Sequence, residues 1–145
     1  MSEELQATIY KVIDETWNKG NLDAVDELYA ANYVLHNFPF PNVEGLDALK
    51  QFVTNTRNAY PDLYNTIEEL LISGEKDSEK ITTRWSWQGT NTGQSTLFPF
   101  PPTGKKVTVI GCTVTHRSGG KGVEEWFYVD YLGLLQQLGV VPARN

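Results

Sequence analysis

The chain has 145 residues, of which 18 are acidic and 12 are basic, so its formal net charge at pH 7 is −6. Its 40% hydrophobic and 12% aromatic content suits one folded domain with its own core and argues against disorder. Nucleic acids and anionic membrane surfaces attract basic proteins, so the acidic balance argues against both as partners. A small neutral molecule or another protein remains as the expected partner.

Cysteine content and hydropathy indicate a cytoplasmic protein. Cys112 is the only cysteine in the sequence, so no intrachain disulfide can form, and we interpret it as a small buried residue. No apolar run approaches the roughly 18 residues that span a bilayer, and the acidic first residues lack the apolar stretch of a signal peptide. We therefore expect a cytoplasmic location and no membrane partner.

Helical spacing of apolar residues dominates the first 60 residues. It predicts a helix of about four turns from Leu5 to Trp17, and a short second helix that Asn21 caps and that carries Tyr29 on its buried face. A third helix is predicted over about 45–60. Between the second and third helices, the segment 32–36 is short and rich in strand-forming residues, and we interpret it as a strand.

After residue 62 the hydrophobic period falls from 3.6 to two, which predicts antiparallel strands at about 64–73, 79–90, 105–117 and 122–130. The proline-rich stretch 92–105 cannot be a central strand. It is either a lid over a cavity mouth or an ordinary rim loop. A last helix is predicted over 131–138. Helices before strands indicate an α+β fold, with the helices on one face of a curved sheet, in a single domain over residues 1–145.

Several local patterns occur in a familiar order along nearly the whole chain. They are Trp17–Val25, Tyr33–His36, Tyr60–Leu63, Gly89–Gly93, Pro101–Lys105, Glu124–Trp126 and Leu132–Gly139. Together they resemble the SnoaL-like polyketide cyclases of the NTF2-like superfamily. The resemblance implies a cone in which a curved antiparallel sheet wraps around N-terminal helices and leaves an internal pocket, often in a homodimer. Family members cyclise polyketide esters by an intramolecular aldol step, and the fold also hosts isomerases, dehydratases and non-catalytic binding proteins.

The resemblance also identifies positions where this chain differs from those cyclases. Their key carboxylate is an Asp directly after the Trp of the last strand, and Phe127 stands there in this chain. Their assisting His lies opposite, on the preceding strand. A three-residue hairpin turn would put Thr113 at that place, and a two-residue turn would put Cys112 there.

An aldol cyclisation needs a base for the proton α to a carbonyl and an acid for the developing alkoxide, which makes His36, Glu125 and Asp130 the catalytic candidates. By resemblance His36 borders the pocket; otherwise it is a structural imidazole. Glu125 shares a strand face with Phe127, so burial among aromatics would raise its pKa. The alternatives for Glu125 are a solvated position or an Arg/Lys partner. Asp130 reaches the pocket if the strand bulges, and otherwise caps the last helix.

Aromatic and neighbouring polar residues are the expected ligand contacts, with core or dimer-interface packing as the alternative for each aromatic. They are Trp17, Tyr60, Trp87, Phe98, Phe100, Thr113 and Phe127. No cluster with metal-ligand spacing occurs, so we expect neither metal nor cofactor. Two functions remain open. One is a cofactor-independent cyclase, isomerase or hydratase that acts on an apolar carbonyl compound; the other is a module that binds an apolar ligand in the same pocket without turning it over.

Overall fold

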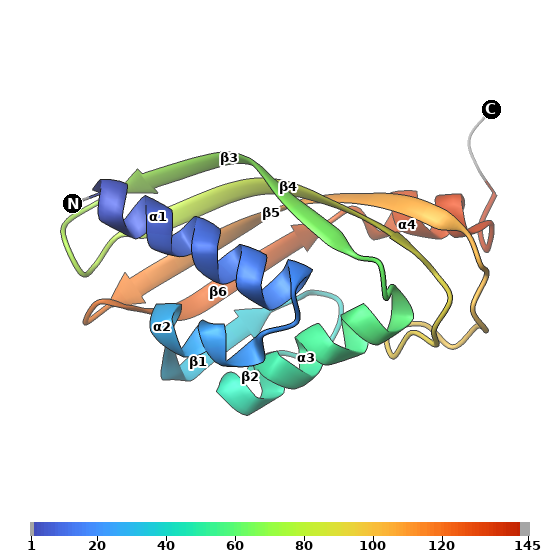
Figure 1. The fold of residues 1–145 in the computed structure, drawn as a ribbon, viewed down its shortest axis with the longest axis horizontal. Coiled ribbons are helices and arrows are strands. Elements are labelled where there is room, and N and C mark those ends of the chain that lie inside the picture. Colours follow the sequence, from blue (N-terminus) through green and yellow to red (C-terminus); the bar gives the residue numbers. More distant parts are fainter. Residues whose placement is uncertain (1, 143–145) are drawn as a thin grey trace.

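One curved sheet of six strands organises the computed structural model, which describes residues 2–142. The strand order is β2-β1-β6-β5-β4-β3. Helices α1 and α3 lie against one face of this sheet, and α4 follows β6 at the far end of the molecule (Figure 1). The elements in chain order are α1 (Ser2–Ile13), the π-helix η1 (Asp14–Asn18), the 3-10 helix η2 (Leu22–Ala24), α2 (Val25–Leu28), β1 (Tyr29–His36), β2 (Val43–Glu44), α3 (Leu46–Ala59), β3 (Tyr64–Ser73), β4 (Lys80–Thr90), β5 (Lys106–Ser118), β6 (Lys121–Val129) and α4 (Tyr131–Leu138).

The α+β class and the helix-then-strand order predicted from the sequence are confirmed. Two local predictions are wrong. Tyr29 begins β1 rather than ending the second helix, because it pairs with Gly122 of β6 in the sheet. Asn21 precedes η2 but makes no capping hydrogen bond through its side chain. The first helix also ends differently, because its last turn widens into the π-helix η1.

The β5–β6 hairpin determines which residues face the helices. Gly119 and Gly120 have φ angles of 60° and 81°, so the two strands are joined by a two-residue turn whose positive φ angles favour glycine. That turn alone would set Cys112 opposite Phe127. A bulge beside Arg117 shifts the register by one residue, so Thr113 pairs with Phe127 instead.

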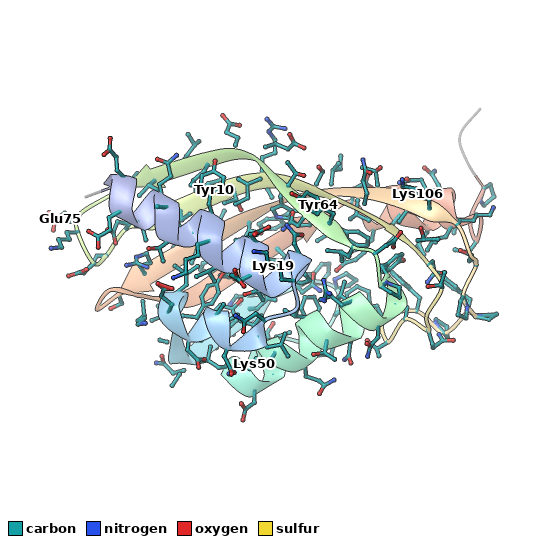
Figure 2. All side chains as sticks on the ribbon, in the orientation of Figure 1. Tyr10, Lys19, Lys50, Tyr64, Glu75 and Lys106 are labelled. Atoms are coloured by element: carbon teal, nitrogen blue, oxygen red, sulfur yellow. The ribbon has the colours of Figure 1, made fainter. Side chains whose placement is uncertain are left out.

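Two apolar clusters form the core. One joins α1, α2 and α3 to β1 and includes Val12, Tyr33 and Val53. The other packs α4 against β4 and β5 and includes Trp85. The charged side chains of Lys19, Glu75 and Lys106, which Figure 2 labels, are exposed. Within the described chain, no helix has the length and hydrophobicity needed to cross a membrane.

Candidate functional site

A cavity of about 120 Å³ lies between the helix-covered face of the sheet and helices α1 and α3. Along β4 it is lined by every second residue from Ile81 to Trp87, because alternate side chains of a strand face the same side. These two positions are six residues apart, which corresponds to about 20 Å of strand. The cavity is therefore elongated along β4.

Apolar and aromatic side chains make up most of the cavity wall. The residues that line it include six of the seven expected ligand contacts: Trp17, Tyr60, Trp87, Phe98, Thr113 and Phe127. Phe100 is not part of the wall; its ring stacks on that of Phe98 at a centroid distance of 5.7 Å. In the described lining no Lys, Arg, His or Asp occurs, and Glu125 carries the sole carboxyl group.

Glu125 lies on β6, with only 3% of its surface exposed. Its Oε2 accepts hydrogen bonds from the Tyr29 hydroxyl, at 3.0 Å, and from the Thr115 hydroxyl. Its Oε1 accepts one from the Tyr33 hydroxyl. The tyrosines come from β1 and the threonine from β5, so both strands that flank β6 contribute to the carboxyl's surroundings. No salt bridge joins Glu125 to a Lys or Arg of residues 2–142.

Burial raises the pKa of the Glu125 carboxyl, and the hydrogen bonds from Thr115, Tyr33 and Tyr29 oppose that rise. The pKa values of Tyr29 and Tyr33 lie well above the ordinary value, because both hydroxyls are buried and lie beside the carboxylate. These tyrosines therefore remain protonated donors at neutral pH. Three donors leave one of the four acceptor positions of the carboxylate open, on Oε1.

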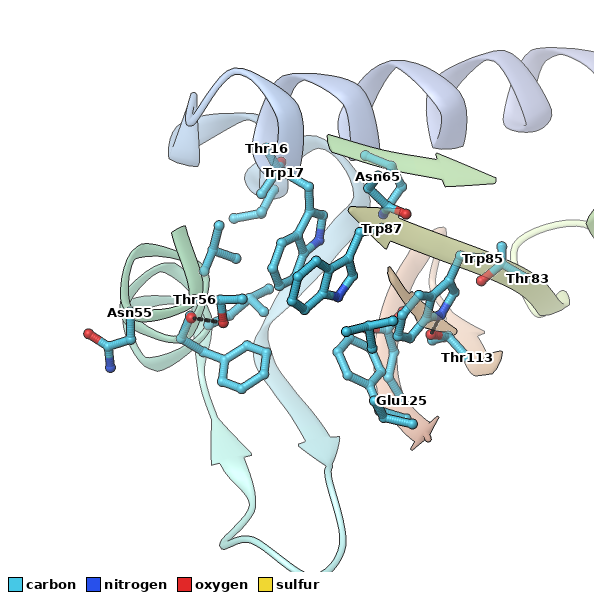
Figure 3. A pocket seen from close by; sticks show the side chains of 18 of the residues that line it. Thr16, Trp17, Asn55, Thr56, Asn65, Thr83, Trp85, Trp87, Thr113 and Glu125 are labelled. Atoms are coloured by element: carbon cyan, nitrogen blue, oxygen red, sulfur yellow. Dashed lines mark hydrogen bonds between the residues drawn. The ribbon is translucent and has the colours of Figure 1, made fainter. Parts of the chain in front are cut away.

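Thr113 is a polar residue of the cavity wall on β5. It lies two positions from Thr115, which pairs directly with Glu125. Its Oγ1 accepts a hydrogen bond from the Trp85 indole N–H at 2.8 Å (Figure 3). Because that bond uses the hydroxyl as an acceptor, its proton is free to be donated to a molecule in the cavity.

The expectation that His36 borders the cavity is wrong. Along β1 the side chains of Tyr33 and Leu35 are buried on the helix side, so His36 points to the outer face of the sheet. There its Nε2 lies 2.7 Å from Oε2 of Glu124, and its ring stacks on Trp126. His36 is therefore a structural imidazole and not a residue of the cavity wall.

Asp130 does not reach the cavity either. Its backbone N–H donates to the Ile110 carbonyl at 3.0 Å, which continues the β5–β6 pairing without a bulge at this end. Its carboxylate accepts from the Gly133 N–H at 2.8 Å and so caps α4. Of the three catalytic candidates, the structure places only Glu125 in the cavity wall.

Sequence reasoning missed the hydroxyl partners of Glu125. Tyr29 and Tyr33 share one face of β1, but the helical spacing of the preceding residues predicts a helix that includes Tyr29 and so hides this signal. Thr115 follows from the hairpin register only when the bulge is known. Thr16 and Asn65 also line the cavity, and no local motif marked them.

The open curved sheet, with helices over one face and an apolar cavity between them, defines an α+β cone of the NTF2-like type. Residues 7–138 match the profile of the SnoaL-like polyketide cyclases, so the chain belongs to that family. A search of curated proteins finds no match to this sequence.

Solved structures with the same fold support this assignment. A candidate polyketide cyclase from Acidithiobacillus ferrooxidans is 29% identical, with a TM-score of 0.75 over 92% of this chain and 93% of that one. IdmH, a candidate polyketide cyclase from Streptomyces antibioticus, is 25% identical, with a TM-score of 0.71 over 92% of this chain and 97% of that one. TsrD from Streptomyces laurentii is 22% identical, with a TM-score of 0.79 over 93% and 97% of the two chains, and shows the shared fold.

Proposed function

We propose that the cavity binds a neutral, largely apolar carbonyl compound and that Glu125 transfers a proton on it without a cofactor. The observation that carries this proposal is the position of Glu125: it is the sole carboxyl of the described cavity wall, and burial raises its pKa. A general acid or base works best when its pKa lies near the working pH. The apolar wall favours a neutral ligand, because it offers no cation to pair with an anion.

The proposed step needs one residue for both proton transfers. The open position on Oε1 of Glu125 takes the proton from the carbon α to the carbonyl, and the electrons of that C–H bond form an enolate. Thr113 donates its hydroxyl proton in a hydrogen bond to the enolate oxygen, supported by the Trp85 N–H behind it. Glu125 then returns the proton, to another carbon in an isomerisation or to the new alkoxide when the enolate carbon attacks a second carbonyl in a cyclisation.

Proton exchange tests this step without knowledge of the natural substrate. The probe is 2-tetralone, a bicyclic ketone with acidic α-protons, in D₂O, with deuterium uptake followed by NMR. We expect the wild-type protein to accelerate uptake, and Glu125→Gln to reduce that acceleration by about 10²- to 10⁴-fold. Glu124→Gln is the matched control, because Glu124 is the neighbouring residue and lies on the outer face. Equal rates for wild type and Glu125→Gln would contradict the catalytic proposal.

A binding module is the second candidate. It is favoured by the three hydroxyl groups that already surround the Glu125 carboxyl and by the apolar Phe127 beside it, which packs against Phe52 and Trp85. In that case 2-tetralone binds, its protons exchange no faster than in buffer, and Glu125→Gln changes neither result.

We also propose that the outer face of the sheet pairs two copies of this chain. On this face Ile110 of β5 and Tyr128 of β6 are 54% and 63% exposed, and such apolar surface is typically covered in an oligomer. Light scattering coupled to size-exclusion chromatography measures the mass directly. We expect the wild-type protein to be a dimer and the Ile110→Lys variant to be a monomer. A wild-type protein that is monomeric at all concentrations would contradict the pairing.

A further inference from the structure

Thr16 is a buried polar residue whose hydroxyl has no protein partner. It lies in the π-helix η1 with 2% of its surface exposed, and no residue in 2–142 hydrogen-bonds to its Oγ1. It also lines the cavity. Buried hydroxyls are rarely left unpaired, and π-turns in helices occur frequently at functional sites. This hydroxyl is therefore a candidate contact for a molecule in the cavity.

Asn65 shows the same feature on the facing strand. Its Oδ1 is buried without a hydrogen-bond partner in the described chain, and the residue lines the same cavity. Its backbone is held firmly, because the Asn18 side chain donates to the Asn65 carbonyl at 3.0 Å and accepts from the Asn65 N–H at 2.6 Å. The π-helix η1 thus contributes Thr16 to the cavity wall and fixes Asn65 through Asn18.

These two groups lie far from Glu125. Asn65 pairs with Trp87 of β4, whereas Glu125 belongs to the row of Thr115 and Ile81. The two rows are six residues apart on β4, or about 20 Å along the strand. Figure 3 shows Thr16 and Asn65 beside the indoles of Trp17 and Trp87, on the opposite side of the pocket from Glu125.

We propose that Thr16 and Asn65 form a second polar subsite, which binds a hydroxyl group at one end of an elongated, neutral, otherwise apolar ligand. The ligand hydroxyl donates to Oδ1 of Asn65 and accepts from the hydroxyl of Thr16, so both orphaned groups become paired. This inference rests on the part of the proposed function that places an apolar molecule in the cavity. The subsite specifies that one end of the ligand is polar and that this end lies far from the Glu125 carboxyl.

The experiment compares biphenyl with 4-hydroxybiphenyl, which share an apolar body and differ by one terminal hydroxyl. Binding is followed by quenching of tryptophan fluorescence, since Trp17, Trp85 and Trp87 line the cavity. We expect the wild-type protein to bind 4-hydroxybiphenyl about 5- to 20-fold more tightly than biphenyl. Asn65→Leu is expected to abolish this preference and Thr16→Val to reduce it, because each substitution removes one polar partner of the ligand hydroxyl.

Two matched controls separate the subsite from general effects on the wall. Asn55→Leu and Thr56→Val remove the same chemical groups from the cavity wall, but these groups are already paired, with Gln51 and with the Phe52 carbonyl. Both variants are expected to keep the hydroxyl preference. Thr16→Val is also expected to raise the Tm of the ligand-free protein by about 2 to 6 °C, because it removes an unpaired buried hydroxyl.

The outcomes distinguish the inference from the proposed function. If neither compound binds the wild-type protein, the cavity takes no apolar molecule, and the proposed function fails together with the subsite. If both bind with equal affinity, the cavity binds apolar molecules but Thr16 and Asn65 serve only water, and the subsite alone is overturned. If Glu125→Gln removes the preference and Asn65→Leu keeps it, the hydroxyl binds at Glu125 and the subsite is likewise overturned.

Discussion

Glu124 and Glu125 are consecutive residues of β6 with the same side chain and opposite surroundings. The Glu125 carboxyl is buried among three hydroxyl donors, and burial raises its pKa. The side chain of Glu124 is 43% exposed on the outer face and meets the His36 imidazole. Strand alternation alone separates them. The face of the strand, and not the residue type, therefore decides which carboxyl can serve acid–base chemistry.

The largest expected difference between the two glutamates is in stability. Glu125→Ala is expected to lower the free energy of unfolding by about 2 to 4 kcal/mol, because Tyr29, Tyr33 and Thr115 lose their shared acceptor in a buried site. Glu124→Ala is expected to cost less than about 1 kcal/mol, as is usual for exposed pairs. Urea denaturation at pH 7 measures both values. Equal costs would show that the hydroxyl network adds nothing to the fold.

The two glutamates should also differ in how they make the stability of the protein depend on pH. The pKa of Glu125 is raised in the folded state, so the folded protein holds this proton more tightly than the unfolded chain does. The associated stability is complete below the unfolded pKa and is lost as pH rises through the folded pKa. Wild-type protein should therefore lose stability relative to Glu125→Gln as pH rises from about 4.5, by at most about 1.4 kcal/mol per pH unit.

Urea titrations of the wild type, Glu125→Gln and Glu124→Gln between pH 4.5 and 8 provide this measurement. Glu124→Gln should keep the wild-type slope, because Glu125 is intact in that variant. A difference between wild type and Glu125→Gln that is flat across the range would show that Glu125 ionises as readily in the folded protein as in the unfolded chain, and one that grows in favour of the wild type as pH rises would show that it ionises more readily.

Much of the fold follows from sequence periodicity, whereas the site depends on details that periodicity does not contain. The shared strand face predicted for Glu125 and Phe127 of β6 forms part of the cavity wall, as does Trp87 of β4. Whether Cys112 or Thr113 faces Phe127 depends on one bulged residue, which has no sequence signature. The partners of Glu125 and the unpaired groups of Thr16 and Asn65 are contacts between distant segments, so only the folded chain reveals them.

His36 provides the smallest expected effect. Its family position suggested a place beside the pocket, but a strand exposes residues 35 and 36 to opposite faces, and Leu35 occupies the inward position. His36→Ala should therefore leave the 2-tetralone exchange rate within about twofold of wild type, and cost less than about 1 kcal/mol of stability through the lost Glu124 contact and Trp126 stacking. NMR exchange and urea denaturation measure the two quantities. A loss of exchange as large as that of Glu125→Gln would mean that the outer face takes part in the chemistry, and the division of roles between the two faces of β6 would have to be abandoned.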